Sequence, residues 1–242
     1  MIPPVLLTPE KDPMGKAIAE YFAKGKAVKL RVLSTQFDED ELPVAQLFRP
    51  FAAMPELERT ALTLAQGRIL DVGAGSGCHA LALQEMGKDV VAIDISPLSV
   101  ETMSLRGVRD ARHVNLFDPA FTERFDCILM LMNGSGIIGR LENMPAFFQR
   151  AKSLLNPGGC IYLDSSDLRY LFDEDETPPT DTYYGQVDFV MQYRNIRGDA
   201  FDWLYIDATT LKQHAAENGF EVEVIQEGEH YDYLARLTPK AE

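Results

Sequence analysis

From residue 68 to residue 167 the sequence alternates short apolar runs with stretches of helical spacing, and this alternation constrains the fold more than any other feature. The apolar runs begin with RILDV and DVVAID, and HALALQEMG between them has the spacing of a helix. Strands that alternate with helices form right-handed crossovers, which build a parallel sheet covered by helices on both faces. The pattern therefore predicts an α/β domain over residues 67–242.

The flanking segments follow different patterns. Residues 1–66 are predicted to form an N-terminal helical cap, because GKAIAEYFAKGKA and MPELERTALTLAQG both have helical spacing. After residue 167 an acidic, proline-containing loop precedes GQVDFVMQYRNIRGDAFDWLYID, which alternates apolar and polar residues around an Arg197-Gly198-Asp199 turn signal. We predict that this loop and a β-hairpin form an insertion over about residues 170–206, before a last helix and a last pair of strands.

The charge and composition of the chain disfavour several kinds of partner and of cellular location. The net charge is −14, and the sequence shows no basic stripe of the kind that displaces counterions from nucleic acid. No apolar run approaches the length of a membrane span, and MIPPVLLTPEKDP lacks the basic start of a signal peptide. The three cysteines show no metal-ligand spacing. We therefore expect a cytoplasmic protein that binds no nucleic acid, membrane or metal; its oligomeric state is not indicated.

The segment ILDVGAGSG, which ends the first predicted strand, indicates a ligand site. Gly73, Gly75 and Gly77 allow the unusual φ angles of a tight turn and let a ligand approach the backbone beside a helix N-terminus. Asp71 precedes this turn, and its carboxylate opposes a pyrophosphate but suits an ammonium or sulfonium group. Asp94 ends the next strand, where an acid accepts hydrogen bonds from both ribose hydroxyls of a nucleotide.

The motifs DVGAGSG and AIDIS resemble those of the class I S-adenosylmethionine-dependent methyltransferases, over about residues 68–168. The resemblance implies a Rossmann-like three-layer sandwich with a seven-stranded mixed sheet of order 3-2-1-4-5-7-6, to which the cap and the extra hairpin are added. It also implies that S-adenosylmethionine is the cofactor. Strand four, ending in LMLMNGSGIIG, and the turn at residues 156–159 would pass beneath it.

The resemblance assigns the cofactor site residue by residue. Asp71 and the glycine loop would lie against the methionine part, Asp94 would hold the ribose, and Ile95 would pack on adenine. Asn115 stands where the family has an acid that reaches adenine, and Asp118 is a possible substitute. The predicted cofactor-binding residues are Asp71, Gly73, Ala74, Gly75, Gly77, Asp94, Ile95, Asn115, Leu116 and Met132.

Catalytic residues are poorly marked, because methyl transfer depends mainly on holding the two reactants at attack distance and excluding water. Candidates come from predicted strand ends and from the cap: Asn133, Asp164, Asp167, Tyr170, Tyr183, Tyr184 and Arg49. NGSG replaces the Asn-Pro-Pro-Tyr sequence that is typical of the superfamily's methylation of amino groups in bases and glutamine. We predict a small-molecule methyl acceptor; the alternatives are a nicotinamide-dependent oxidoreductase and a non-catalytic binding protein.

The segment LFRPFAAM, residues 47–54, is too apolar for an exposed linker. One interpretation is that it simply packs on the sheet. The other is that it forms a lid, with Arg49 facing a carboxylate of the cofactor or of the acceptor, and moves with the acidic loop after Leu171.

Overall fold

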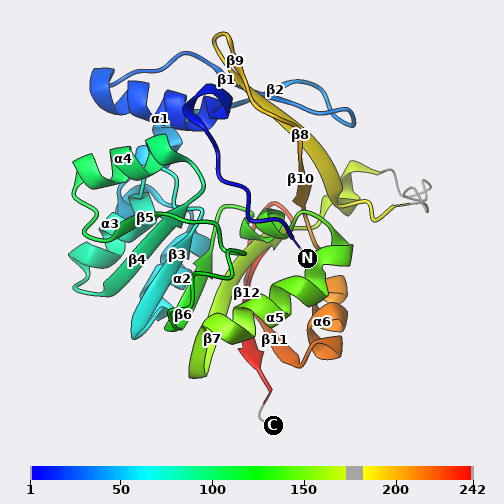
Figure 1. Cartoon of the computed structure of the whole chain (residues 1–242). Coiled ribbons are helices and arrows are strands. Elements are labelled where there is room, and N and C mark those ends of the chain that lie inside the picture. Colours follow the sequence, from blue (N-terminus) through cyan, green and yellow to red (C-terminus); the bar gives the residue numbers. More distant parts are fainter. Residues whose placement is uncertain (1, 173–181, 241–242) are drawn as a thin grey trace.

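The computed structural model describes residues 2–172 and 182–240, and it contains two sheets. The acidic stretch 173–181, which was predicted to be a loop, lies outside the described residues. The seven-stranded sheet has the order β11-β12-β7-β6-β3-β4-β5 (Figure 1). Its strands are β3 (Arg68–Val72), β4 (Asp89–Asp94), β5 (Ala111–His113), β6 (Phe125–Met130), β7 (Leu155–Ser166), β11 (Phe220–Glu227) and β12 (Asp232–Pro239).

This order is the predicted 3-2-1-4-5-7-6 arrangement, and the prediction is confirmed. β3, β4, β5, β6 and β7 pair in parallel, whereas β12 runs antiparallel to both of its neighbours. The central position of β3 follows from the right-handed crossovers that the alternating helices impose. The carboxyl ends of the parallel strands therefore meet along one edge, which we call the carboxyl edge.

Helices cover both faces of this sheet, as side-chain alternation along the strands requires. Leu70 and Val72 of β3 pack in the same core cluster as α5 (Met144–Leu154) and α6 (Ala208–Glu217). Ile69 points the other way and packs with α2 (Glu56–Leu64), α3 (Cys78–Glu85) and α4 (Pro97–Arg106). None of the described helices is long and apolar enough to cross a membrane.

Residues 2–66, which were predicted to form a helical cap, contain the two predicted helices, α1 (Pro13–Lys24) and α2, together with two strands that the sequence did not predict. These strands are β1 (Leu30–Leu33) and β2 (Asp40–Leu42). Of the two helices, α2 packs on the large sheet. Short 3-10 helices complete the described chain: η1 (Pro9–Lys11), η2 (Val44–Phe48), η3 (Phe51–Ala53), η4 (Gly134–Ile138), η5 (Leu141–Asn143) and η6 (Leu168–Leu171).

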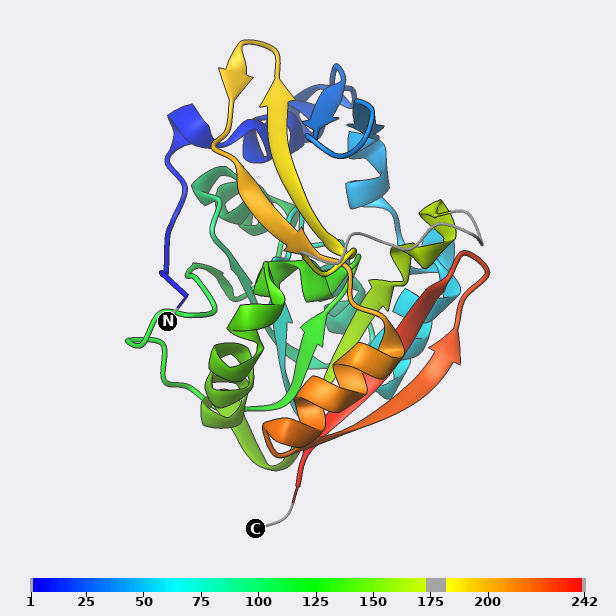
Figure 2. The same ribbon diagram turned by 90° about the vertical axis from the view of Figure 1, so that its right-hand side faces the viewer.

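β1 and β2 join the inserted hairpin to form a second, antiparallel sheet of order β10-β8-β1-β2, with β9 also paired to β8. The inserted strands are β8 (Gln186–Tyr193), β9 (Ile196–Arg197) and β10 (Phe201–Leu204). The tight turn between β8 and β9 falls at residues 194–195 and not at Gly198, because Arg194 adopts the left-handed φ of 54°. This sheet arches over the carboxyl edge of the large sheet (Figures 1 and 2).

Candidate functional site

The glycine loop lies between the end of β3 and the start of α3. Gly73, Gly75 and Gly77 all have positive φ, at 69°, 57° and 81°. A Cβ on Gly77 would come within 2.9 Å of Met103 and of Val108, so this position needs glycine for space as well as for conformation. The loop therefore presents bare backbone at the carboxyl edge, beside the N-terminus of α3.

Asp94, at the end of β4, ties this loop to the neighbouring strand. One carboxylate oxygen accepts a 2.8 Å hydrogen bond from the Gly75 N–H, and the other accepts a 2.8 Å bond from the Ser96 N–H. Burial raises the pKa of Asp94 to about 6, although these two hydrogen bonds act in the opposite direction. Each oxygen keeps a free lone pair, so the carboxylate can accept from two further hydroxyl groups.

Asp71 is buried below the glycine loop, with 1% of its surface exposed. Its Oδ2 accepts a hydrogen bond from none of the described residues. Burial raises the pKa of this carboxyl group, and the charge of nearby His79 opposes that rise. A buried carboxylate oxygen without a partner is costly in a protein, so this atom indicates a place for a cationic ligand group.

A buried charge network that the sequence did not predict lies next to Asp71. Glu58 of α2 accepts hydrogen bonds from Arg49, and its Oε2 lies 2.8 Å from Nε2 of His79. Burial alone would raise the pKa of Glu58, but His79 and Arg49 outweigh it and the pKa is lowered. The pKa of His79 is raised in turn, since the contact with Glu58 and the charge of Asp71 overcome its burial.

The structure corrects the expectation for Arg49. Its guanidinium faces the carboxylate of Glu58, within the protein, and its side chain is only 10% exposed. The segment around it packs on the glycine loop, where the Ser76 hydroxyl donates to the Leu47 carbonyl. The packing interpretation of residues 47–54 therefore fits the described contacts. Arg49 Nε has no described hydrogen-bond partner, so one donor of this side chain remains unused.

The other candidate catalytic residues gather at the carboxyl ends of β6 and β7. Met132 and Asn133 both have left-handed backbone conformations, with φ of 66° and 55°, which is uncommon for residues other than glycine. Asp164 holds this turn, because it accepts backbone hydrogen bonds from Met132 at 3.0 Å and from Gly134 at 2.9 Å. Burial raises the pKa of Asp164 to about 6. Strained backbone of this kind clusters at functional sites.

Aromatic residues border this turn. The Tyr184 hydroxyl donates to Asp167 at 2.6 Å, and the Tyr183 hydroxyl donates to Asp207 at 2.7 Å. Tyr170 is exposed and stacks on Tyr231, with 4.9 Å between the ring centroids. Asn133, Asp164, Asp167 and the three candidate tyrosines thus share one region, whereas Arg49 belongs to the network beside Asp71.

The residues predicted to bind adenine differ in their exposure and in whether their polar groups are already hydrogen-bonded. Ile95 follows the end of β4 and is 38% exposed, whereas Leu116 is buried in the main core. The Asn115 amide donates to the Val5 carbonyl at 2.9 Å and accepts from the Phe117 N–H, so its hydrogen-bonding groups already have protein partners. The N-terminal residues therefore run beside the predicted adenine position.

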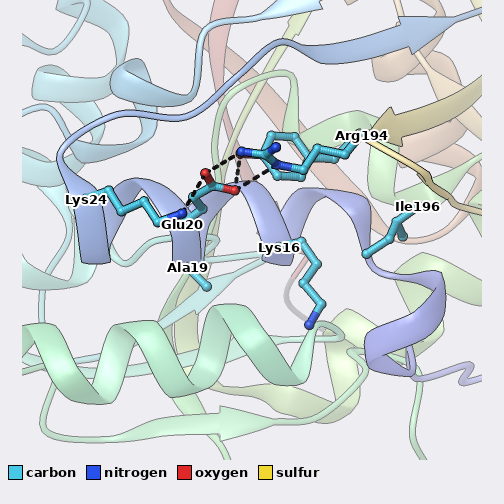
Figure 3. Close-up of a pocket in the computed structure, with 7 residues that line it drawn as sticks. Lys16, Ala19, Glu20, Lys24, Arg194 and Ile196 are labelled. Carbon is cyan, nitrogen blue, oxygen red and sulfur yellow. Dashed lines mark hydrogen bonds and ion pairs between the residues drawn. The ribbon is translucent and has the colours of Figure 1, made fainter.

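Two other regions lie away from the carboxyl edge. Residues 156–159 lie in the first part of β7, which begins at Leu155, and the Asn156 amide donates to Asp126 near the start of β6. This segment is at the edge opposite the carboxyl edge, so it does not pass beneath a ligand as predicted. A surface depression of about 340 Å³ lies between α1 and the turn after β8 (Figure 3). Its wall contains the ion pairs of Glu20 with Arg194 and with Lys24. The pair with Arg194 joins the second sheet to α1.

Among residues 2–172 and 182–240, no three acidic, histidine or cysteine side chains gather as metal ligands.

Comparison with known proteins identifies the family. A family model described as a methyltransferase domain matches residues 44–225. The chain belongs to the methyltransferase family. A solved S-adenosylmethionine-dependent methyltransferase from Bacteroides fragilis, in complex with S-adenosyl-L-homocysteine, is 66% identical; the match covers 98% of this chain and 99% of that one, with a TM-score of 0.92.

Two curated relatives match shorter stretches of this methyltransferase. A cypemycin N-terminal methyltransferase from a Streptomyces species is 32% identical over 102 residues, which is 41% of this chain and 42% of that protein. A ubiquinone biosynthesis O-methyltransferase from Xanthomonas euvesicatoria pv. vesicatoria is 27% identical over 154 residues, which is 60% of this chain and 62% of that protein. The chain thus spans about half the length of these two relatives.

The cofactor of this methyltransferase is S-adenosylmethionine, and the described residues fit it. The unpartnered oxygen of Asp71 suits the ammonium group of the methionine part, and Asp94 has free lone pairs for the ribose. The roles of the individual site residues remain predictions. The sequence did contain one signal for Glu58, since a glutamate shares the buried helical face of α2 with Leu57, Ala61 and Leu62.

Proposed function

We propose that this methyltransferase transfers a methyl group from S-adenosylmethionine to a small molecule. The observation that carries the proposal is the second sheet, which arches over the carboxyl edge of the large sheet (Figure 2). Asp94 ends β4 at this edge, and the glycine loop follows the end of β3 there. β10 reaches the turn after β6, where the Ser135 hydroxyl donates to the Leu204 carbonyl at 2.7 Å. A covered edge suits a small acceptor better than a long polymer, and the net charge of −14 opposes nucleic acid.

The chemistry that the cofactor supplies is a methyl group on a positively charged sulfur, which a nucleophile displaces in line. The protein holds the two reactants in this geometry and keeps water away, which can contribute most of the rate enhancement. We assign the glycine loop, Asp71 and Asp94 to hold the cofactor. The turn at residues 132–134, fixed by Asp164, forms the border between cofactor and acceptor in this proposal.

One of the relatives supports a small acceptor without identifying it. One of the two curated relatives is named for ubiquinone biosynthesis, and the other for the N-terminus of cypemycin. A nicotinamide-dependent oxidoreductase is disfavoured by the family match and by the buried acid at Asp71, which would oppose a pyrophosphate.

The test uses S-adenosylmethionine with a deuterated methyl group and a metabolite extract of low molecular mass. The full chain should produce at least one compound that gains a deuterated methyl group, while Asp94→Ala should produce much less of it. Binding of S-adenosyl-L-homocysteine without any labelled product would favour a binding protein. Binding of reduced nicotinamide cofactor, measured by fluorescence titration, without binding of S-adenosyl-L-homocysteine would favour the oxidoreductase.

A further inference from the structure

One face of the second sheet carries a row of aromatic side chains. β8 and β10 pair so that Phe189 lies opposite Phe201, and Trp203 lies two residues further along on the same face. Tyr205 continues this alternation, and its ring contacts Phe189 edge-on with 6.5 Å between centroids. All four rings are partly exposed. We call Phe189, Phe201, Trp203 and Tyr205 the aromatic face.

The aromatic face is directed toward the carboxyl edge of the large sheet. Further along the same face, Leu30 and Tyr193 pack with Ala17 of α1, which lies over α4 on the cofactor side (Figure 1). At the near end Trp203 lies directly on Gly136, where a Cβ would come within 1.8 Å of the indole ring. Gly136 belongs to η4, which follows the strained turn after β6. The aromatic face therefore looks onto the region where a methyl acceptor must bind.

Tyrosines and carboxylates continue this surface at its lower end. Tyr183 and Tyr184 have ring centroids 4.7 Å apart, and their hydroxyls donate to Asp207 and Asp167. They are joined to the aromatic face through Gly185, whose carbonyl accepts a 2.7 Å hydrogen bond from the Tyr205 N–H. The tyrosines and the aromatic face thus form one continuous surface.

The carboxylates of this surface have no cationic partner among the described residues. Asp164, Asp167 and Asp207 form no ion pair with any described lysine or arginine. Elsewhere acids such as Glu20 and Glu123 are paired with arginines. Among the described residues, the Tyr205 hydroxyl and the indole N–H of Trp203 also have no hydrogen-bond partner. Aromatic rings beside unpaired carboxylates attract a cation.

We propose that the aromatic face and the adjoining Tyr183, Tyr184 and Asp167 bind an amine carried on an apolar or aromatic body, and that its nitrogen is the methyl acceptor. This inference rests on the proposed function. The bound ammonium group first loses one proton to solvent, which frees the nitrogen lone pair. This lone pair then forms the bond to the methyl carbon, the carbon–sulfur bond breaks, and sulfur keeps that electron pair. The extra proton on nitrogen then passes to solvent. Positive charge moves from sulfur to nitrogen during the step, so nearby ring faces and carboxylates stabilise the transition state.

The chain offers a direct reporter, because Trp203 is its single tryptophan. Tryptophan emission is measured while benzylamine, benzyl alcohol or benzoate is titrated into the full chain, with and without saturating S-adenosyl-L-homocysteine. We expect a saturable change in emission with benzylamine, binding roughly tenfold weaker with benzyl alcohol, and none with benzoate. Equal affinity for benzoate and benzylamine, or no change with any probe, would overturn the proposal.

A pair of variants separates this surface from general effects on folding. Phe189→Leu keeps an apolar side chain but removes a ring of the aromatic face, and should weaken benzylamine binding several-fold while leaving S-adenosyl-L-homocysteine binding unchanged. Phe22→Leu, at an exposed position of α1, is the matched control and should change neither. An equal loss in both variants would contradict the inference. Calorimetry with S-adenosyl-L-homocysteine measures cofactor binding and so tests the proposed function. The amine titration in the absence of S-adenosyl-L-homocysteine tests the aromatic face alone, so the two failures can be told apart.

Discussion

Asp94→Asn is a nearly isosteric substitution from which the structure predicts a selective loss of cofactor affinity. The two carboxylate oxygens accept from the Gly75 and Ser96 N–H groups at 2.8 Å, which leaves one lone pair on each for a ribose hydroxyl. Asparagine replaces one oxygen with an NH2 group, which donates and cannot accept. One ribose hydroxyl then loses its acceptor, and the other faces an uncharged oxygen.

A hydrogen bond to a charged group contributes about 1.5–3 kcal/mol, and each 1.4 kcal/mol corresponds to about a tenfold change in affinity. The dissociation constant of S-adenosyl-L-homocysteine should therefore rise about 10- to 100-fold in Asp94→Asn, as measured by isothermal titration calorimetry. Asp94→Ala, which removes both acceptors, should lose at least as much.

The matched control is Asp126→Asn. Asp126 also uses both oxygens as acceptors, from the Arg68 N–H and the Asn156 amide, each at 2.8 Å, but it lies at the opposite edge of the sheet. Both variants should lose about 1–3 kcal/mol of unfolding free energy, because each leaves one donor without its partner. Only the Asp94 variant should lose cofactor affinity. A folded Asp94→Asn protein with unchanged affinity would refute the reasoning.

Three further predictions concern pH, the buried network and the packing of the second sheet. Burial raises the pKa of Asp94 to about 6. Cofactor affinity, measured by calorimetry, should therefore fall as the pH drops below that value, because the carboxylate becomes protonated. Asp94→Asn, which has no carboxylate at this position, should not show this fall. Glu58→Gln leaves Arg49 and His79 without their anionic partner and should cost about 3–5 kcal/mol in urea unfolding, whereas Glu56→Gln, exposed on the same helix, should stay within about 0.5 kcal/mol of the parent. Gly136→Ala forces a Cβ into Trp203, so it should cost about 1–3 kcal/mol and change the tryptophan emission; a parent-like emission spectrum would contradict the described contact.

The order of the large sheet could be predicted because its signals are local. β3, β4, β6 and β7 each contain an apolar run next to a helical stretch, and the glycine loop with Asp71 and Asp94 lies within one stretch of 24 residues. Handedness then leaves few topologies to consider. The same locality made the ends of β6 and β7 recognisable as site regions.

The second sheet could not be predicted in full, because its pairing is not local. β1 pairs with β8, where Leu30 lies opposite Tyr193, more than 150 residues away. The three-residue strand β2 is acidic and partly exposed, so it has no apolar pattern of its own. The turn at Arg194 was missed because an arginine there adopts a left-handed conformation that glycine or asparagine would normally occupy.

The buried network and the position of Arg49 depend on tertiary packing. Arg49 and Glu58 lie nine residues apart on different elements, and His79 comes from a third. An arginine in an apolar segment fits either a ligand contact or an internal ion pair, and only the fold decides between them. The Asn115 contact with Val5 depends in the same way on where the N-terminal residues run.

The most direct test of the central claim is the fate of the methyl group. The full chain is incubated with S-adenosylmethionine that carries a radiolabelled methyl group and with a whole-cell extract, and the products are separated by size. We predict that the label appears in the fraction of low molecular mass and that Asp94→Asn lowers the initial rate about 10-fold or more at limiting cofactor. Label recovered only in protein or nucleic acid would contradict a small-molecule acceptor.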